Sequence, residues 1–580
     1  MNLPFGDHQM NALFEPGQIG PIETPNRIVM PAMTTRLAEA DGQVTDATIA
    51  YFTARAAGGV GLVTVEMAAP EAVGRHRLRE LGLYDDRFLS GLRRLVEALH
   101  AAGARASIQL GHGGGHTRVD ICGEAPIAPS AVPHFVYEVT GETIVPLEMT
   151  AERIAETTRA YIAAAGRAKQ AGFDCVEVHG AHGYLISQFL TPEENTRDDD
   201  WGGSLENRAR FGLDIVRGIK DEVPGIGVIF RFNADDFFPG GIDFKDARRI
   251  AVWAAESGAD AIHVTAGHYR SLPSAERMIP PMAYPDATFL DYAAIIRSEV
   301  SVPVIAVGRL GDPAIAAAAL NEGKADFIAL GRPLLADPLW PATVRAGHTP
   351  RRCLACNSCV NDMRGGTGLR CLVNPATGRE LKYDKNTGPN GERIAVIGAG
   401  PAGLTYADLV AKENQVTIFE RAGLAGGAFR LAGKAPRFQE VETSETSLTR
   451  YIEALVQRCT EQGVEIRYDT NVEDNPSQLT DFDRIVIASG ADYRTGLALP
   501  ARLILTLGLA RLPLFKRLFS SDDFRDRLYH RWRSGTGARL SSLISSQAHA
   551  GQTLQIIGDA AQAGKSAAAI ESAFEAAYSR

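Results

Sequence analysis

Eight short apolar runs alternate with longer amphipathic segments over residues 25–345, and this alternation restricts the fold more than any other feature of the chain. The intervening segments, such as RFLSGLRRLVEALHAAG, repeat apolar residues at helical spacing. Strands that alternate with helices form parallel sheets, and eight such units close into a barrel. We therefore predict an α/β protein with an N-terminal (β/α)8 TIM barrel. The runs begin at Asn26, Val60, Arg105, Phe173, Ile226, Ala259, Val302 and Ala325.

The last two of these runs end in glycine–arginine pairs, Gly308-Arg309 and Gly331-Arg332. In TIM barrels the loops after strands seven and eight often bind a phosphate group. A glycine–arginine pair after a strand is also a common turn, but two pairs in the final two positions favour a phosphate site.

Four of the seven cysteines lie within nineteen residues: Cys353, Cys356, Cys359 and Cys371. Three thiolates within seven residues are spaced to hold one face of an iron–sulfur cubane, and the fourth reaches back from the following loop. A zinc site is the alternative, although zinc sites more often pair two separated C-x-x-C motifs. The position of the cysteines between two nucleotide-binding patterns favours an iron–sulfur cluster on an electron path.

The second nucleotide-binding pattern begins at Arg393, after the polar linker KYDKNTGPNGE. A strand-like run leads into the motif GAGPAG, which contains Gly398, Gly400 and Gly403, and a second strand-like run ends in Glu420. Glycines at such a turn let the backbone approach a pyrophosphate at a helix N-terminus, and the acidic residue accepts the ribose hydroxyls. We predict a Rossmann-like dinucleotide-binding domain.

The chain is therefore expected to contain a barrel over 1–345, a cysteine segment and linker over 346–390, and a dinucleotide-binding domain over 391–580. A net charge of −9 gives no basic footprint for nucleic acid. No membrane span is expected, because no apolar run reaches the roughly 18 residues that a spanning helix needs. The N-terminus MNLPFGDHQM lacks an export signal. We expect a cytoplasmic protein, in which thiolates stay reduced.

The combination of motifs resembles the Old Yellow Enzyme superfamily, in particular its large iron–sulfur flavoprotein branch, which includes 2,4-dienoyl-CoA reductase, 2-enoate reductase and trimethylamine dehydrogenase. The resemblance implies FMN in the barrel, a 4Fe–4S cluster on the four cysteines and FAD on the C-terminal domain, and it leaves the use of NAD(P)H open. Besides the glycine–arginine pairs, the cysteines and GAGPAG, the motifs that carry it are PNRIVMPAMTT, IQLGHGG, HGAHGYLISQFL and WGGSLENRARF.

The resemblance also assigns cofactor-binding residues. It places Met33 and Thr34 at the flavin ring, Gln109 at its pyrimidine edge, and Arg231 beside that edge as a cation that stabilises the reduced, anionic flavin. An ion pair within the barrel is the alternative for Arg231. The other cofactor positions carried over are Met67, Ala402, Arg421, Gly427, Val472, Gly490 and Asp559.

The motif HGAHGYL carries the predicted catalytic groups. His179 and His182 lie three residues apart after the fourth predicted strand. Two imidazole donors at this spacing are expected to hold a carbonyl or carboxylate oxygen and to polarise a conjugated double bond. Tyr184 resembles the family's proton donor, and a phenol is protonated at neutral pH. His268 is a further catalytic candidate, with Tyr269 beside it in the pocket.

We expect an ene- or enoate reductase that transfers hydride from FMN to an α,β-unsaturated carbonyl or acyl compound, with electrons arriving through FAD and the cluster. The first alternative is an amine dehydrogenase that passes electrons outward through the cluster to a protein acceptor. The second is a non-catalytic electron-transfer subunit. Trimethylamine dehydrogenase has tyrosine at the position of His179, so HGAHGYL favours the reductase.

Three departures from the family pattern are visible. Ala32 stands where many relatives have proline, and Gly115 stands where arginine is frequent. The third is the largest: a stretch at about 495–550 replaces the family's NAD(P)H-binding domain and contains no glycine fingerprint.

This replacing stretch is basic and amphipathic, with nine Lys or Arg against three Asp between Ala501 and Leu540. It is expected either to pack back on the FAD domain as a helix pair or to dock an acidic redox partner or a membrane surface. An electron-transfer flavoprotein or a ferredoxin is the partner we consider, and we expect a homo-oligomer. The candidate docking residues are Arg511, Lys516, Arg517, Arg525 and Arg531.

Overall fold

The computed structural model of the chain divides into two compact units, which we describe separately. The first contains Met1–Leu334, Pro338–Arg345 and Val360–Leu369, and the second contains the remainder. The described residues are 10–135, 143–383, 388–493, 498–519, 521, 533–535, 537–545 and 551–579.

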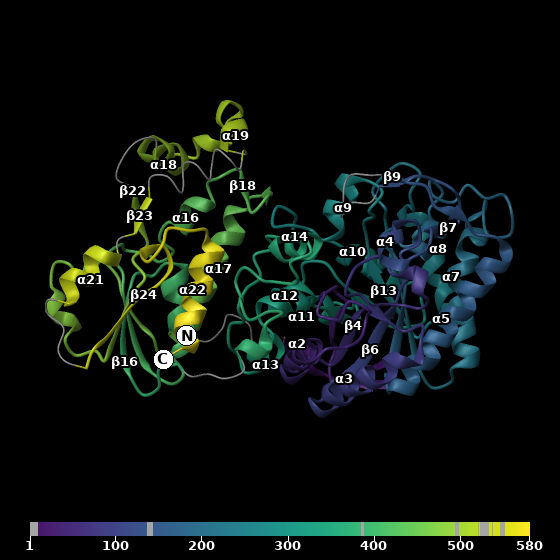
Figure 1. The fold of residues 1–580 in the computed structure, drawn as a ribbon, viewed down its shortest axis with the longest axis horizontal. Coiled ribbons are helices and arrows are strands. Elements are labelled where there is room, and N and C mark those ends of the chain that lie inside the picture. Colours follow the sequence, from purple (N-terminus) through teal and green to yellow (C-terminus); the bar gives the residue numbers. More distant parts are fainter. Residues whose placement is uncertain are drawn as a thin grey trace. The chain divides into compact units, whose positions relative to one another are not determined.

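Eight parallel strands close into a barrel in the first unit (Figure 1). The last strand pairs with the first through Ile328 and Ile28, so the ring has no free edge. Each predicted apolar run forms one strand, and the predicted TIM barrel is confirmed. In order around the ring, the strands are β3 (Ile28–Met30), β4 (Leu62–Ala69), β6 (Arg105–Leu110), β11 (Cys175–Gly180), β12 (Gly227–Asn233), β13 (Ala261–Thr265), β14 (Val304–Ala306) and β15 (Phe327–Ala329).

Helices connect these strands and cover the outside of the barrel (Figure 1). Several begin at a side chain that accepts a backbone N–H of the first turn, as Thr150 and Ser204 do for α5 and α7. The longer helices are α2 (Asp46–Ala57), α3 (Leu89–Ala101), α5 (Ala151–Ala171), α7 (Leu205–Glu222), α8 (Phe244–Glu256), α10 (Leu290–Arg297) and α11 (Pro313–Asn321).

Shorter elements occupy the loops of the barrel. The hairpin of β1 (Gly17–Ile19) and β2 (Ile22–Thr24) precedes the first barrel strand, and β5 (Leu81–Gly82) pairs with the end of β4. The other loop elements are η4 (Gly114–His116), α4 (Val119–Cys122), β7 (Ile127–Ala128), β8 (His134–Phe135), β9 (Thr143–Ile144), β10 (Leu147–Glu148), α6 (Leu185–Leu190) and α9 (Leu272–Met278).

Side chains alternate between the two faces of each strand, and this alternation determines which residues fill the barrel interior. Cys175, Ile229 and Ala261, near the starts of β11, β12 and β13, form a buried apolar cluster with Ile19 of the hairpin. Side chains two residues further along point to the same face of a strand. Those positions hold polar residues, so the interior changes from apolar to polar toward the carboxyl ends of the strands.

The second unit is built on a parallel sheet of five strands, with β16 at its centre. Helix α15 (Pro401–Val410) packs against α17 (Glu445–Glu461) and α22 (Ser566–Tyr578). Such doubly wound sheets bind ligands at the carboxyl ends of their strands, where the strand order reverses. In sheet order the strands are β20 (Glu465–Arg467), β17 (Gln415–Phe419), β16 (Arg393–Ile397), β21 (Arg484–Ile487) and β24 (Thr553–Ile556).

The stretch between β21 and β24 adds no parallel strand in its described part, because these two strands pair directly. Leu505, Ala510 and Phe519 of its helices are buried with Ala435 in one apolar cluster. Every helix among the described residues is too short or too polar to cross a membrane. The elements of the stretch are β22 (Ala491–Tyr493), α18 (Ala498–Thr506), η7 (Leu509–Arg511), α19 (Pro513–Phe519), β23 (Arg533–Gly535) and α21 (Gly537–Ser545).

Candidate active site

The carboxylate of Glu177 organises the polar interior of the barrel. Gln109 donates from Nε2 to Oε1 at 2.7 Å, and His263 Nδ1 lies 2.6 Å from Oε2. Arg231 Nη1 lies 3.8 Å from Oε1. Burial opposes ionisation of Glu177, but His263 and Arg231 outweigh it and lower its pKa to about 2. The barrel therefore holds a fixed negative charge beneath Arg231.

Arg231 forms the ion pair that was considered for it, with Glu177. Nitrogen atoms of Arg231 and of the neighbouring His179 nevertheless remain without a hydrogen-bond partner in the described part of the chain. Arg231 Nε and His179 Nδ1 are buried and have no hydrogen-bond partner among the described residues. Buried polar atoms are rarely left unpaired in folded proteins. A ligand with several acceptors, such as the pyrimidine edge of a flavin, would satisfy them, so the residues fit FMN.

Three of the predicted catalytic side chains come together at the end of β11. The expectation that both histidines follow this strand was wrong for His179, which is part of β11 itself. The ring of His179 lies 5.2 Å from that of His182 and 5.1 Å from that of Tyr184, centroid to centroid. His182 Nε2 lies 3.1 Å from Thr265 Oγ1. Burial, and then the charge of Arg231, lowers the pKa of His179 to about 3 and that of His182 well below its usual value. Both imidazoles are therefore uncharged at neutral pH.

A left-handed turn brings these groups together. His182 and Gly183 have φ values of +66° and +86°. A Cβ at Gly183 would lie 2.5 Å from the ring of His268, so only glycine lets that imidazole approach. The turn also places His182 beside His268 through a backbone bridge.

Tyr269 is a second phenol beside Tyr184, and no local sequence pattern indicated its acidity. Its ring lies 5.8 Å from that of Tyr184. The guanidinium of Arg364 lies 5.3 Å from the ring centroid, and Arg77 Nη2 lies 3.5 Å from the hydroxyl. Burial raises the pKa of Tyr269, but Arg364 and Arg77 outweigh it and lower the pKa to about 8. Arg77 also donates to Thr34, a predicted flavin contact, at 3.1 Å.

The two predicted methionines lie in the same region. Met67 is buried with Tyr184 and Tyr269 in one apolar cluster. The sulfur of Met33 lies next to Gly331, where a Cβ would approach it to 3.1 Å. This contact connects the predicted flavin site with the second glycine–arginine turn.

Both glycine–arginine turns are anchored to the segment before α10. Arg309 donates to Asp286 at 2.8 Å, and Arg332 donates to the carbonyl of Pro280 at 2.8 Å. Gly308 and Arg309 have positive φ values, +113° and +56°, which turn the backbone sharply at the end of β14. The two guanidinium groups thus hold the turns in place through hydrogen bonds. Phosphate binding at these turns remains a prediction.

The four predicted metal ligands belong to the second unit. The Cys353 sulfur accepts the N–H of Ala355 at 3.3 Å, and Ala355 and Asn357 have φ values of +51° and +56°. Burial, followed by the charges of Cys353 and Cys356, raises the pKa of the Cys371 thiol to about 12. The sulfurs and the tight loop around them fit an iron–sulfur cluster, and Cys359 lies in the first turn of α14 (Ser358–Arg364).

The dinucleotide motif forms a turn between β16 and α15. A Cβ on Gly403 would meet the carbonyl oxygen of Gly398 at 2.0 Å, so glycine is required where the helix crosses the strand end. Gly400 faces open space at the helix N-terminus. Glu420 accepts the N–H groups of Ala399 and Ala422 at 2.8 and 2.9 Å and so fixes the turn. These residues fit a bound pyrophosphate.

The remaining predicted cofactor-binding residues of the second unit belong to the loops and the core of its parallel sheet. Gly427, with a φ of +50°, approaches Gly400, and a Cβ on Gly490 would meet open space. Asp559 accepts the N–H of Gly564 at 3.1 Å. Val472 is buried in the core of the sheet, and Arg421 is exposed. Ala402 is buried beneath Gly558. Their cofactor contacts remain predictions.

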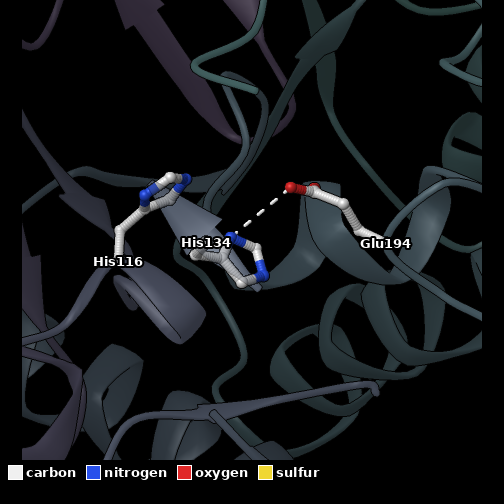
Figure 2. Close-up of side chains that lie close together, drawn as sticks. All are labelled: His116, His134 and Glu194. Carbon is white, nitrogen blue, oxygen red and sulfur yellow. Dashed lines mark ion pairs between the residues drawn. The ribbon is translucent and has the colours of Figure 1, made fainter. Parts of the chain in front are cut away.

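A further group of imidazoles surrounds Glu194 and was not expected from the sequence (Figure 2). His268 Nε2 lies 3.1 Å from Glu194 Oε2, and His134 Nδ1 lies 3.5 Å from Oε1. The ring of His116 lies 5.0 Å from that of His134 and 5.8 Å from that of Tyr269. Burial opposes charge on Glu194, but His268 and His134 outweigh it and lower its pKa to about 2.

Comparison with known proteins agrees with this geometry. A family model described as NADH:flavin oxidoreductase / NADH oxidase matches residues 12–350. The NADH oxidase of Thermoanaerobacter brockii is 37% identical over 489 residues, which cover 83% of this chain and 73% of that protein. The cinnamate reductase of Clostridium sporogenes is 32% identical over 521 residues, which cover 84% and 75% of the two chains.

A solved structure of 2-naphthoyl-CoA reductase with 2-naphthoyl-CoA shares the fold. It superposes with a TM-score of 0.83 at 24% identity, over 98% of this chain and 99% of that one. The matched family covers the whole barrel and its polar interior. The chain therefore belongs to the NADH:flavin oxidoreductase / NADH oxidase family, in agreement with its resemblance to the Old Yellow Enzyme superfamily, and it is a flavin-dependent oxidoreductase.

Proposed function

We propose that the protein is an ene- or enoate reductase that reduces the carbon–carbon double bond of an α,β-unsaturated carbonyl or acyl compound. The observation that carries this proposal is the group of two uncharged imidazoles, His179 and His182, beside the phenol of Tyr184. When bound, FMN in the barrel supplies the hydride, and FAD and a 4Fe–4S cluster in the second unit supply its electrons.

The residues of the chain then have separate tasks. A neutral imidazole offers one N–H, so His179 and His182 together present two donors to a substrate oxygen. Drawing electron density toward that oxygen makes the β-carbon electrophilic. Tyr184 is buried and donates a proton to the α-carbon. Arg231 compensates negative charge beside the pyrimidine edge of the flavin.

The proposed cofactor set rests on three groups of residues. The barrel offers Gln109 and Arg231 with the two glycine–arginine turns for FMN. The thiols of Cys353, Cys356, Cys359 and Cys371 are ligands of the type that iron–sulfur clusters use. The turn at GAGPAG and the fixed carboxylate of Glu420 support FAD.

Anaerobic stopped-flow spectroscopy tests the direction of the reaction. We expect enones and enoates to restore the flavin absorbance of pre-reduced protein, and amines to leave the oxidised protein unchanged. His179→Ala should weaken the binding of carbonyl ligands and phenols, because one of two oxygen donors is lost. Bleaching by an amine without re-oxidation by any unsaturated compound would instead identify an amine dehydrogenase.

We further propose that a protein such as an electron-transfer flavoprotein or a ferredoxin delivers electrons to the second unit. The described part of the stretch that replaces the family's nicotinamide domain supports this, because it contains no βαβ unit of its own. Arg511, Lys516 and Arg517 are exposed there, although Arg511 also donates to the carbonyl of Gly433. Arg525 and Arg531 lie outside the described residues. The neighbouring exposed apolar side chains are Leu503, Leu507, Leu512, Leu514 and Leu518.

Salt dependence distinguishes this donor from a nicotinamide. Exposed charges are screened within about 8 Å at physiological ionic strength, so reduction by an acidic partner should slow as salt rises. Charge reversal at Lys516 and Arg517 should slow it at low salt, whereas reversal of Arg94 on the barrel should not. Rapid FAD reduction by NADH or NADPH alone, in protein whose FMN site is emptied, would refute the partner.

A further inference from the structure

Two loops of the barrel unit bring three side chains together: His116 and His134 follow β6, and Glu194 follows β11 (Figure 2). One ligand atom from each lies within 4.8 Å of the others. The separation of His134 Nδ1 and Glu194 Oε1 is 3.5 Å. Two ligands on a tetrahedral zinc ion, with bonds of about 2.0–2.1 Å, stand roughly 3.3 Å apart, so this pair is already spaced for one ion.

These atoms are buried and lack other partners. His134 and Glu194 are almost fully shielded from solvent, at 1% and 0% exposure. Nε2 of His116 and both ring nitrogens of His134 have no hydrogen-bond partner among the described residues. Native proteins leave few buried polar groups unpaired, and a bound ion is one of the recognised partners of such groups.

His268 orients the carboxylate. The N–H of Arg270 donates to His268 Nδ1 at 3.0 Å, so the proton of a neutral ring is on Nε2, which faces Glu194 Oε2 at 3.1 Å. Oε1 is left for another partner on the side of His134. This contact is an ion pair rather than an aligned hydrogen bond, and outer contacts of this kind orient the first ligands in metal sites.

Gly115 makes room for this arrangement. A Cβ at position 115 would lie 2.3 Å from Cδ2 and 2.6 Å from Nε2 of His134. The imidazole thus occupies the space that any side chain at position 115 would need. The absence of a side chain at Gly115 therefore allows the ring of His134 to take this position.

We propose that His116, His134 and Glu194 bind one divalent transition-metal ion of the zinc type. Two nitrogens and one carboxylate oxygen suit Zn²⁺ or Fe²⁺ and do not suit Mg²⁺ or Ca²⁺, which prefer oxygen ligands.

Three protein ligands leave a coordination position open, as in catalytic zinc sites. The ring of His116 packs edge-on against Tyr269 and lies 6.4 Å from that of Tyr184, centroid to centroid. The ion therefore sits at the rim of the pocket that contains both phenols. Its open position takes an anionic or carbonyl oxygen, such as the carboxylate or acyl oxygen of a substrate.

Zinc binding to the flavin-loaded protein tests the proposal directly. After chelation and dialysis against Zn²⁺, metal analysis should find one zinc per chain. Its K-edge absorption fine structure should show nitrogen and oxygen ligands at about 2.0–2.1 Å, with imidazole scattering, and no sulfur at about 2.3 Å. This edge is separate from that of iron, so a cluster does not interfere. Mg²⁺ in excess should not displace the zinc.

Three variants locate the ion. His134→Ala and Glu194→Gln should weaken zinc binding by more than about 100-fold, because changes to outer residues alone cost about 10–100-fold. Gly115→Ala should weaken it by displacing the His134 ring, and flavin content reports that the barrel remains folded. His100→Ala, at a surface imidazole paired with Asp174, is the control and should bind zinc normally.

The zinc K-edge spectrum of the wild-type protein tests the location of the ion without any variant. Zinc bound through sulfur alone would place the metal at the cysteines and overturn the proposal. The absence of stoichiometric zinc, or equal uptake by His134→Ala and the wild type, would overturn it as well.

Discussion

Tyr184→Phe should slow the oxidation of pre-reduced protein by an enone by about 10²–10⁴-fold, the usual contribution of a positioned general acid. The ring that packs against His76, His179 and Tyr269 is kept, so enone affinity should change little. Only the hydroxyl proton is removed. Single-turnover stopped-flow measurements with reduced protein separate the two effects.

Two further variants complete this experiment. Tyr292→Phe removes a phenol on α10 that donates to Asp235 outside the catalytic group, and it should leave the rate unchanged. Tyr269→Phe tests the other phenol of the pocket, whose pKa is lowered to about 8. If Tyr184→Phe keeps the wild-type rate while Tyr269→Phe loses it, the proton comes from Tyr269, and the rate should then fall above about pH 8.

Cys353→Ala should abolish the proposed iron–sulfur cluster and with it the proposed transfer of electrons between FAD and FMN. Three cysteines cannot complete the thiolate set of a stable 4Fe–4S cluster in this loop. FMN should remain bound, because its predicted site is formed by barrel residues of the other unit. Iron and sulfide analysis, flavin extraction and anaerobic reduction kinetics measure the three consequences.

The matched control is Cys122→Ala, since this free thiol lies in the short helix α4 of the barrel unit, apart from the cysteine run. It should keep the iron content and the reduction kinetics of the wild type. Full iron content in Cys353→Ala would contradict the ligand assignment. Zinc in place of iron in anaerobically purified wild type would contradict the cluster itself.

The barrel was predictable because its determinants are local. Each strand is a short apolar run beside a helix with its own periodicity, and chain order fixes the neighbours of parallel strands. The motif HGAHGYL likewise holds the predicted catalytic groups within six residues. The structure brings His179, His182 and Tyr184 together, as that spacing led us to expect.

Residues that act across long sequence distances were missed. Glu177 meets Gln109 and His263 through strand register, which a list of motifs does not encode. Arg364 reaches Tyr269 from a segment nearly a hundred residues away. No local pattern marks such pairs. Alternation along β11 offered the one usable clue, because Glu177 shares a strand face with His179.

The two glycines at positions 115 and 183 have a consequence for engineering the pocket. Each leaves a gap that an imidazole fills, His134 in one case and His268 in the other. A methyl group at position 115 would displace the ring of His134, and one at position 183 would displace the ring of His268. Neither change replaces a residue that is proposed to contact the substrate. Mutant libraries that vary only the residues lining the active site would overlook both positions. A side chain at either glycine would nevertheless change the shape of the site.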